Sequence, residues 1–133
     1  MRILHLVTFV FAVLRPNGPD TKGEHWVVCG FKKVVPSNER PAPNSYVNAG
    51  GVLFVCAGEP KLAYSSGQRV ANYNFLPVAH EPSLAAQGAS GAWRRVWPLA
   101  LEDRPKIGEI CRQLVDEMGY AMVVQDLHGN RLT

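Results

Sequence analysis

Two tryptophans and two arginines lie within five consecutive positions, and these side chains are well suited to binding a partner. The segment reads Trp93-Arg94-Arg95-Val96-Trp97. In a strand, Trp93, Arg95 and Trp97 would share one face because side chains alternate. Aromatic and arginine side chains dominate the binding energy of protein interfaces, and they also stack on bases and hold phosphates. We therefore predict a partner-binding site at Trp93, Arg94, Arg95 and Trp97. The alternative is that the rings pack on the sheet and the arginines cover its edge.

A second candidate site is a pocket in a curved sheet that would gather His5, His25 and Tyr64. Residues that converge only in three dimensions would serve a small enzyme or a protein that binds a small ligand. His25 and Cys29 are four positions apart, so a strand would place them on one face, and His5 would face them across a hairpin. A zinc site needs several converging ligands. Because the sequence contains no C-x-x-C or H-x-x-x-H pair, we predict no metal and no cofactor.

The three cysteines indicate the compartment in which the protein works. Cys29, Cys56 and Cys111 are odd in number, widely spaced and set among apolar residues. We predict buried free thiols rather than a disulfide. Unbridged cysteines suit a reducing environment, so we expect a cytoplasmic protein.

The composition indicates one soluble domain made largely of short strands. The chain has 133 residues, the size of an ordinary domain, so we expect a single domain over 1–133. Apolar residues make up 47% and charged residues 19%, which argues against disorder. Frequent turns are expected from 12 glycines and 10 prolines. The net charge of +3 is mild, which makes nucleic-acid binding a weak alternative, because such proteins usually carry a denser basic patch.

The first strand is expected at Ile3–Leu14, where both faces of an extended chain are apolar. With Arg2 before it, this run resembles a short signal peptide, but it is too short to span a membrane and no small-residue cleavage site follows it. A central strand buried on both faces explains the pattern better. After a turn rich in proline and glycine, His25–Val35 is expected to pair with it as an antiparallel hairpin.

Further strands and turns alternate along the middle of the chain. Pro36–Asn48 contains three prolines and is predicted to be a surface loop that takes part in binding. Leu62–Ser65 follows a predicted tight turn and is either a strand or one helical turn. The other expected strands are Val52–Ala57, Gln68–Val78, Trp93–Leu101 and Tyr120–Asp126.

A helix is predicted near 104–118, because apolar residues there repeat at spacings of three and four. Asp103 would cap its start and Gly119 would end it. The expected fold class is therefore α+β, with a twisted, mainly antiparallel sheet of about five to seven strands packed against this helix. One helix cannot cover all the apolar sheet surface. We therefore expect the sheet to curl into a half-barrel or two chains to pack as a homodimer.

Three segments together resemble the small ADP-ribosyltransferases. They are His5 in an N-terminal strand, the stretch from Gly51 to Ser66, and the strand segment from Gly119 to Asp126. In that family an N-terminal strand bears a residue of the nicotinamide site, and a later strand runs into a segment that contains serine. The resemblance implies an enzyme with a nicotinamide pocket near His5.

The leading hypothesis is a non-catalytic binding protein whose partner contacts the strand at 93–97 and the loop Pro36–Asn48. The alternatives are a small enzyme or ligand-binding protein, including an ADP-ribosyltransferase-like enzyme, and a weak nucleic-acid binder. The sequence contains no phosphate-binding loop of the form G-x-x-x-x-G-K-[ST] and no G-x-S-x-G motif. Catalytic residues therefore cannot be named from the sequence, and whether the chain is an enzyme stays open.

Overall fold

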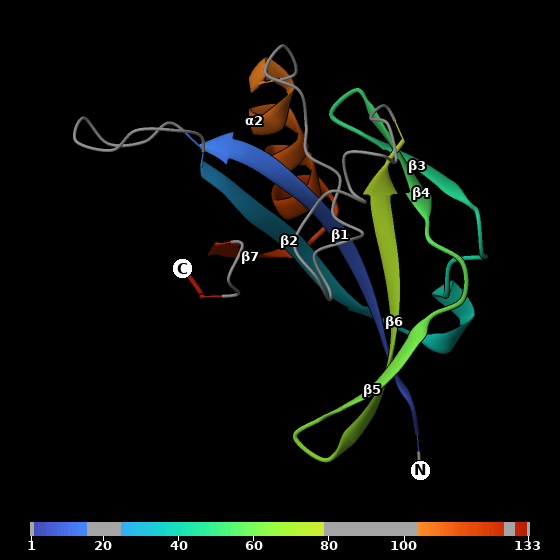
Figure 1. The fold of residues 1–133 in the computed structure, drawn as a ribbon. Helices are drawn as coiled ribbons and strands as arrows, with labels where there is room; N and C mark the ends of the chain where they lie inside the picture. The colour runs from blue at the N-terminus through green and yellow to red at the C-terminus, as the bar shows by residue number, and fades with distance from the viewer. Residues whose placement is uncertain (1, 16–24, 79–103, 127–129, 133) are drawn as a thin grey trace.

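The chain forms one sheet with a helix against one of its faces (Figure 1). The structure is a computed structural model, and it describes residues 2–15, 25–78, 104–126 and 130–132. The predicted strand Trp93–Leu101 and the predicted cap Asp103 lie outside the described residues.

Seven strands make up the sheet, in the order β3-β4-β6-β1-β2-β7, with β5 paired to β6 beside that path. The α+β fold with a mainly antiparallel sheet, predicted from the sequence, is confirmed. The strands are β1 (Leu4–Arg15), β2 (His25–Val35), β3 (Tyr46–Ala49), β4 (Val52–Cys56), β5 (Lys61–Ser65), β6 (Gln68–Pro77) and β7 (Ala121–Asp126).

The central strand β1 pairs along both of its edges. On one side it forms the predicted antiparallel hairpin with β2, in a register that places His5 opposite Val35 and Arg15 opposite His25. On the other side, residues 4–9 pair in parallel with β6. This is the one parallel pair among the described strands, and it gives β1 a neighbour on each side within an open sheet.

The main core lies between the sheet and the helix. Because side chains alternate along a strand, odd-numbered residues of β1, β2 and β6 point to the helix-covered face. Ile110 and Leu114 of the helical segment are fully buried there against phenylalanine rings from four strands. These rings are Phe9, Phe11, Phe31, Phe54 and Phe75. A smaller cluster of Ala12 and Val28, with Val10 and Trp26 packed against it, lies on the opposite face.

The helix predicted near 104–118 is confirmed, in two parts. A regular helix, α2, spans Arg104–Arg112, and one π-helical segment, η4, spans Gln113–Glu117. The backbone N–H of Met118 donates to the carbonyl of Gln113, five residues earlier, at 3.0 Å, which forms the wider ring of a π turn. Gly119 follows with φ of 75°, a conformation that glycine adopts without a steric penalty, and this ends the helical segment as predicted.

The β3–β4 turn packs directly on the helix. Its two central residues, Gly50 and Gly51, have φ of 57° and 82°, as a two-residue hairpin turn requires. The N–H of Gly50 donates to Oε1 of Gln113. A Cβ built on Gly50 would lie 2.5 Å from the backbone nitrogen of Ile110, so only glycine fits this contact.

The strand β3 differs from the sequence expectation. Tyr46–Ala49 pairs with β4, whereas Pro36–Asn48 was predicted to be a loop throughout. The loop before β3 contains a short 3-10 turn, η1 (Ser37–Glu39). The strand is four residues long and borders a segment rich in proline and asparagine. This strand is recognised by its pairing with β4, because its own four residues show no alternation of apolar and polar side chains long enough to predict a strand.

The segment between β4 and β5 was predicted to be a tight turn, and it is a bulge instead. Cys56 lies opposite Phe75 and Lys61 lies opposite Asn72, so four residues, 57–60, face only two residues of β6. β5 therefore runs on in the direction of β4 along the same edge of β6. Of the two alternatives for this segment, the strand is correct.

Candidate functional site

The predicted pocket residues are spread over the sheet. His5 and His25 lie at opposite ends of the β1–β2 hairpin, because His5 pairs with Val35 and His25 pairs with Arg15. A separation of about ten residues along a strand corresponds to roughly 33 Å. Tyr64 lies on β5, and 73% of its surface is exposed. The antiparallel register therefore prevents His5 and His25 from sharing one pocket, and His5 does not face Cys29 across the hairpin.

His5 has a different partner, Tyr73 of β6. The hydroxyl of Tyr73 lies 3.3 Å from Nδ1 of His5, and both side chains are buried. The rings are tilted by 37° with centroids 6.0 Å apart. The pair joins the two strands of the parallel ladder at the edge of the main core. Because His5 is buried and its ring has a hydrogen-bond partner, a structural role is sufficient to account for it.

The predicted binding residues Trp93, Arg94, Arg95 and Trp97 lie outside the described residues, whereas the loop Pro36–Asn48 is described. Most of that loop is exposed, and its end is fastened to β4. The N–H of Asn44 donates to the carbonyl of Cys56 at 3.1 Å, and the N–H of Cys56 donates to the carbonyl of Ser45 at 2.8 Å. The loop is therefore exposed over most of its length, and hydrogen bonds to β4 hold its C-terminal end in place.

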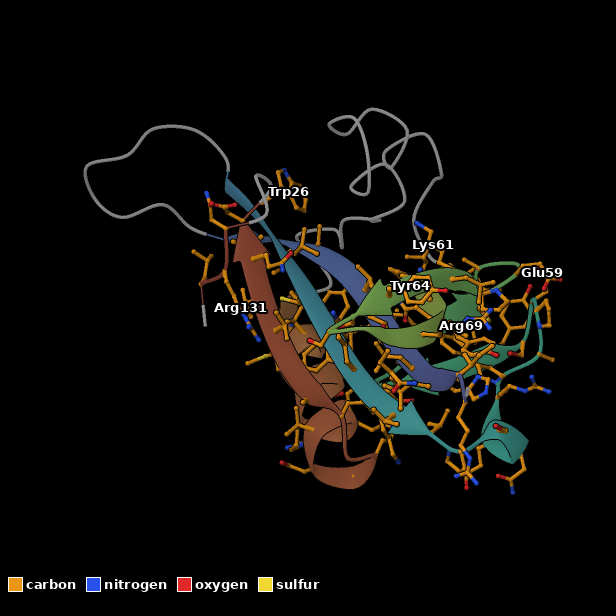
Figure 2. The ribbon with its side chains drawn as sticks, turned by 90° about the horizontal axis from the view of Figure 1, so that it is seen from below. Trp26, Glu59, Lys61, Tyr64, Arg69 and Arg131 are labelled. Carbon is orange, nitrogen blue, oxygen red and sulfur yellow. The ribbon has the colours of Figure 1, made fainter. Side chains whose placement is uncertain are left out.

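In the β5–β6 hairpin, β5 is the most exposed of the described strands. All five residues of β5 are exposed, including the large apolar side chains of Leu62 (66%) and Tyr64 (73%). Leu62 and Tyr64 share one face of the strand, and Tyr64 lies directly opposite Arg69. Figure 1 shows the hairpin at the end of the molecule away from α2. In Figure 2, Lys61, Tyr64 and Arg69 project from this hairpin.

The hairpin is shaped by the turns at its two ends. Ser66 and Gly67, with φ of 51° and 77°, form a two-residue turn that suits the twist of the flanking strands. At the other end, the bulge at 57–60 separates β5 from β4, and such bulges bend a strand. Within the described residues, β5 pairs with β6 alone, so its outer edge is open.

The sequence pointed to Tyr64 only as a pocket residue and did not indicate that the whole hairpin is an exposed site. The signal was present, because Leu62 and Tyr64 alternate with Lys61, Ala63 and Ser65, and a turn dipeptide follows. The alternation was too short to be distinguished from one helical turn without knowledge of the pairing with β6.

A row of polar side chains crosses the sheet face opposite the helix. Oγ1 of Thr8 donates to Oδ1 of Asn72 at 2.7 Å, and Nδ2 of Asn72 donates to Oδ1 of Asn74 at 3.2 Å. Lys32 lies opposite Thr8 and Lys61 lies opposite Asn72, both with exposed side chains. Since Thr8 is only 2% exposed, this row serves to fix the register of the parallel pair β1–β6.

The cysteines are free, as predicted, and their environment makes them poor nucleophiles. Burial, together with a smaller contribution from the neighbouring Cys111, raises the pKa of Cys29 to about 12. Burial also raises the pKa of Cys56 and of Cys111. These thiols stay protonated near neutral pH, whereas reactive cysteines have lowered pKa values.

The described residues contain neither a candidate metal site nor a candidate membrane helix. No group of three or more histidine, cysteine, aspartate or glutamate side chains in that part of the chain is placed to hold a metal ion. No helix within the same residues is long and apolar enough to cross a membrane. The chain was also compared with known protein families, with curated proteins and with solved structures, and none of them matches it.

Proposed function

We propose that this protein is a non-catalytic binding protein that uses the β5–β6 hairpin to contact a protein partner. The observation that carries the proposal is the exposure of Leu62 and Tyr64 on one face of a strand whose outer edge is open among the described residues. Most proteins protect an open edge because it readily pairs with another chain. Tyrosine and arginine, here Tyr64 opposite Arg69, are also enriched among the residues that dominate interface energies.

The proposal extends to the segments that the sequence singled out. Trp93, Arg94, Arg95 and Trp97 would contribute aromatic and cationic contacts, and the exposed loop Pro36–Asn48 would enlarge the contact surface. We propose that the protein acts as a homodimer in the cytoplasm. The three free cysteines support a reducing compartment.

Site-specific photo-crosslinking in cells of the protein's source tests this function. A benzophenone side chain placed at Tyr64 should give discrete adducts on irradiation, because a bound partner would cover this position. The matched control is the same side chain at Glu117, which is exposed on the helical segment η4 and not on the hairpin. Adducts at Tyr64 and none at Glu117 would support the proposal. The proposal fails if neither Tyr64 nor probes at Trp93 and Trp97 give an adduct above the control.

A second candidate, nucleic-acid binding, is favoured by one feature of the same hairpin. Lys61, Tyr64 and Arg69 lie together on a two-stranded ribbon that projects from the sheet (Figure 2). Such ribbons enter nucleic-acid grooves, and aromatic rings stack on bases. Binding to a fluorescent single strand should then fall steeply as salt rises. Absence of binding at low salt would exclude this candidate and leave the protein-binding proposal intact.

A further inference from the structure

We infer that the open edge of β5 pairs with β5 of a second copy of this chain, antiparallel and centred on Ala63. This inference rests on the proposed function, because it names the partner and the register for the same exposed hairpin. It follows from the direction of the backbone groups, the limits of the open edge and the match of the side chains.

The backbone groups that point outward belong to Leu62 and Tyr64. In a two-residue hairpin, the residues that flank the turn, here Ser65 and Gln68, form a hydrogen-bonded pair. Hydrogen-bonded pairs then alternate along an antiparallel ladder. Ser65, Ala63 and Lys61 therefore direct their N–H and C=O groups to β6. Those of Leu62 and Tyr64 point away from β6 and are available to another strand.

The open edge is limited to the five residues of β5, and this limit sets the register. Pro60 precedes Lys61 and has no N–H to donate, so a ladder cannot extend past it. At the other end the Ser66–Gly67 turn reverses the chain. Two copies related by a two-fold axis pair along all five positions only when the axis passes between the two Ala63 residues. In that register, Leu62 of each copy forms a hydrogen-bonded pair with Tyr64 of the other.

The side chains are self-complementary in this register. On one face, Leu62 meets Tyr64 of the second copy twice, and an aromatic–aliphatic pair across strands is stabilising. On the other face, Lys61 lies opposite Ser65 of the second copy, and the two Ala63 side chains meet at the axis. No two like charges are directly opposed, which would destabilise a ladder. The pairing uses the same edge in both copies, so it closes at a dimer rather than forming a fibre.

The size of the contact predicts a reversible dimer. One pair of five-residue strands covers less than the roughly 1,200 Å² of a standard interface. We therefore expect a dimer that dissociates on dilution and forms one sheet continuous across both copies. The hairpin that would form this contact lies at the end of the molecule away from α2 (Figure 1).

Register-specific disulfide trapping of the full chain tests the inference. Ala63→Cys places two thiols opposite each other at the axis, in a non-hydrogen-bonded pair whose geometry suits a disulfide. The control is Ser65→Cys, which keeps the Leu62–Tyr64 contacts and would hold its two thiols on Cα atoms roughly 14 Å apart, beyond the reach of a disulfide. On mild oxidation with diamide, Ala63→Cys should form a covalent dimer, whereas Ser65→Cys and the wild type should form none.

A second pair of variants removes the backbone bonds without changing the register. Leu62→Pro deletes an outward N–H, whereas Leu62→Ala retains it, and neither change removes a bond to β6. By sedimentation, the dissociation constant should rise about tenfold or more for Leu62→Pro relative to Leu62→Ala. Equal trapping of Ala63→Cys and Ser65→Cys would overturn the inferred register. A wild type that stays monomeric at every concentration would overturn the dimer. In that case, adducts of Tyr64 with another protein would still support the proposed binding function.

Discussion

Replacing Gly50 with alanine should destabilise the protein far more than the same change at Gly51. Both glycines have positive φ in the β3–β4 turn, so both substitutions force alanine into the left-handed region. Only Gly50 touches the helix. Its added Cβ would lie 2.5 Å from the nitrogen and 2.8 Å from the Cα of Ile110, whereas nothing lies within 4 Å of a Cβ on Gly51. Gly51→Ala is therefore a matched control for backbone strain.

The expected magnitudes follow from separate contributions. The left-handed conformation costs alanine about 1–2 kcal/mol at either position. At Gly50, overpacking adds about 1–3 kcal/mol, because the atoms in the way belong to the helix backbone and cannot rotate aside. Displacing the turn also weakens the hydrogen bond from Gly50 to Gln113, worth about 1 kcal/mol. The loss should be about 3–6 kcal/mol for Gly50→Ala, a large share of the roughly 5–15 kcal/mol typical of a domain.

Urea denaturation followed by far-UV circular dichroism measures this difference. Both variants gain the same stabilisation from lower chain entropy in the unfolded state, so that term cancels in the comparison. The midpoint of Gly50→Ala should fall well below that of Gly51→Ala, with an unchanged slope. If the two variants lose the same stability, the β3–β4 turn does not pack against the helix, and the reasoning is refuted.

Three further predictions concern the core, the thiols and the helix end. Thr8→Val should cost about 1–2 kcal/mol in urea denaturation because it leaves Oδ1 of Asn72 without its donor, and Thr8→Ser should cost less. The raised pKa of Cys29, about 12 against an ordinary 9.0, means that the unfolded chain ionises first. The contribution of this thiol to stability should therefore stay constant below about pH 9 and fall above it, and the fall in total stability above about pH 9 should be smaller in Cys29→Ala. Gly119→Ala should lower the melting temperature by several degrees, since φ there is 75°, whereas Gly108→Ala should not lower it.

Local patterns were sufficient to predict the long elements. The apolar run of β1, the alternation in β2 and the stripe that includes Ile110 and Leu114 each bury one face, and each lies where the sequence indicated. The π-helical segment was not predicted, and neither was the hydrogen bond that its first residue, Gln113, accepts from Gly50 of the distant β3–β4 turn.

Features that depend on distant pairing could not be read from the sequence. Nothing local indicates that β1 pairs in parallel with β6, or that Tyr46–Ala49 forms a strand. The expectation that His5 and His25 share a pocket was wrong, and the predicted antiparallel hairpin already implied that they could not. An antiparallel hairpin of two long strands brings the start of one to the end of the other, so the two histidines lie at opposite ends.

The parallel pair at the centre of the sheet has a consequence for synthesis of the chain. Thr8 and Asn72, which hydrogen-bond across β1 and β6, are 64 residues apart. At about 5–20 residues per second, a ribosome needs roughly 3 to 13 seconds to make the chain between them. During that interval β1 has at most one of its two neighbours, and its apolar side chains await β6. A chaperone that binds nascent apolar segments would therefore be expected to recognise β1 first.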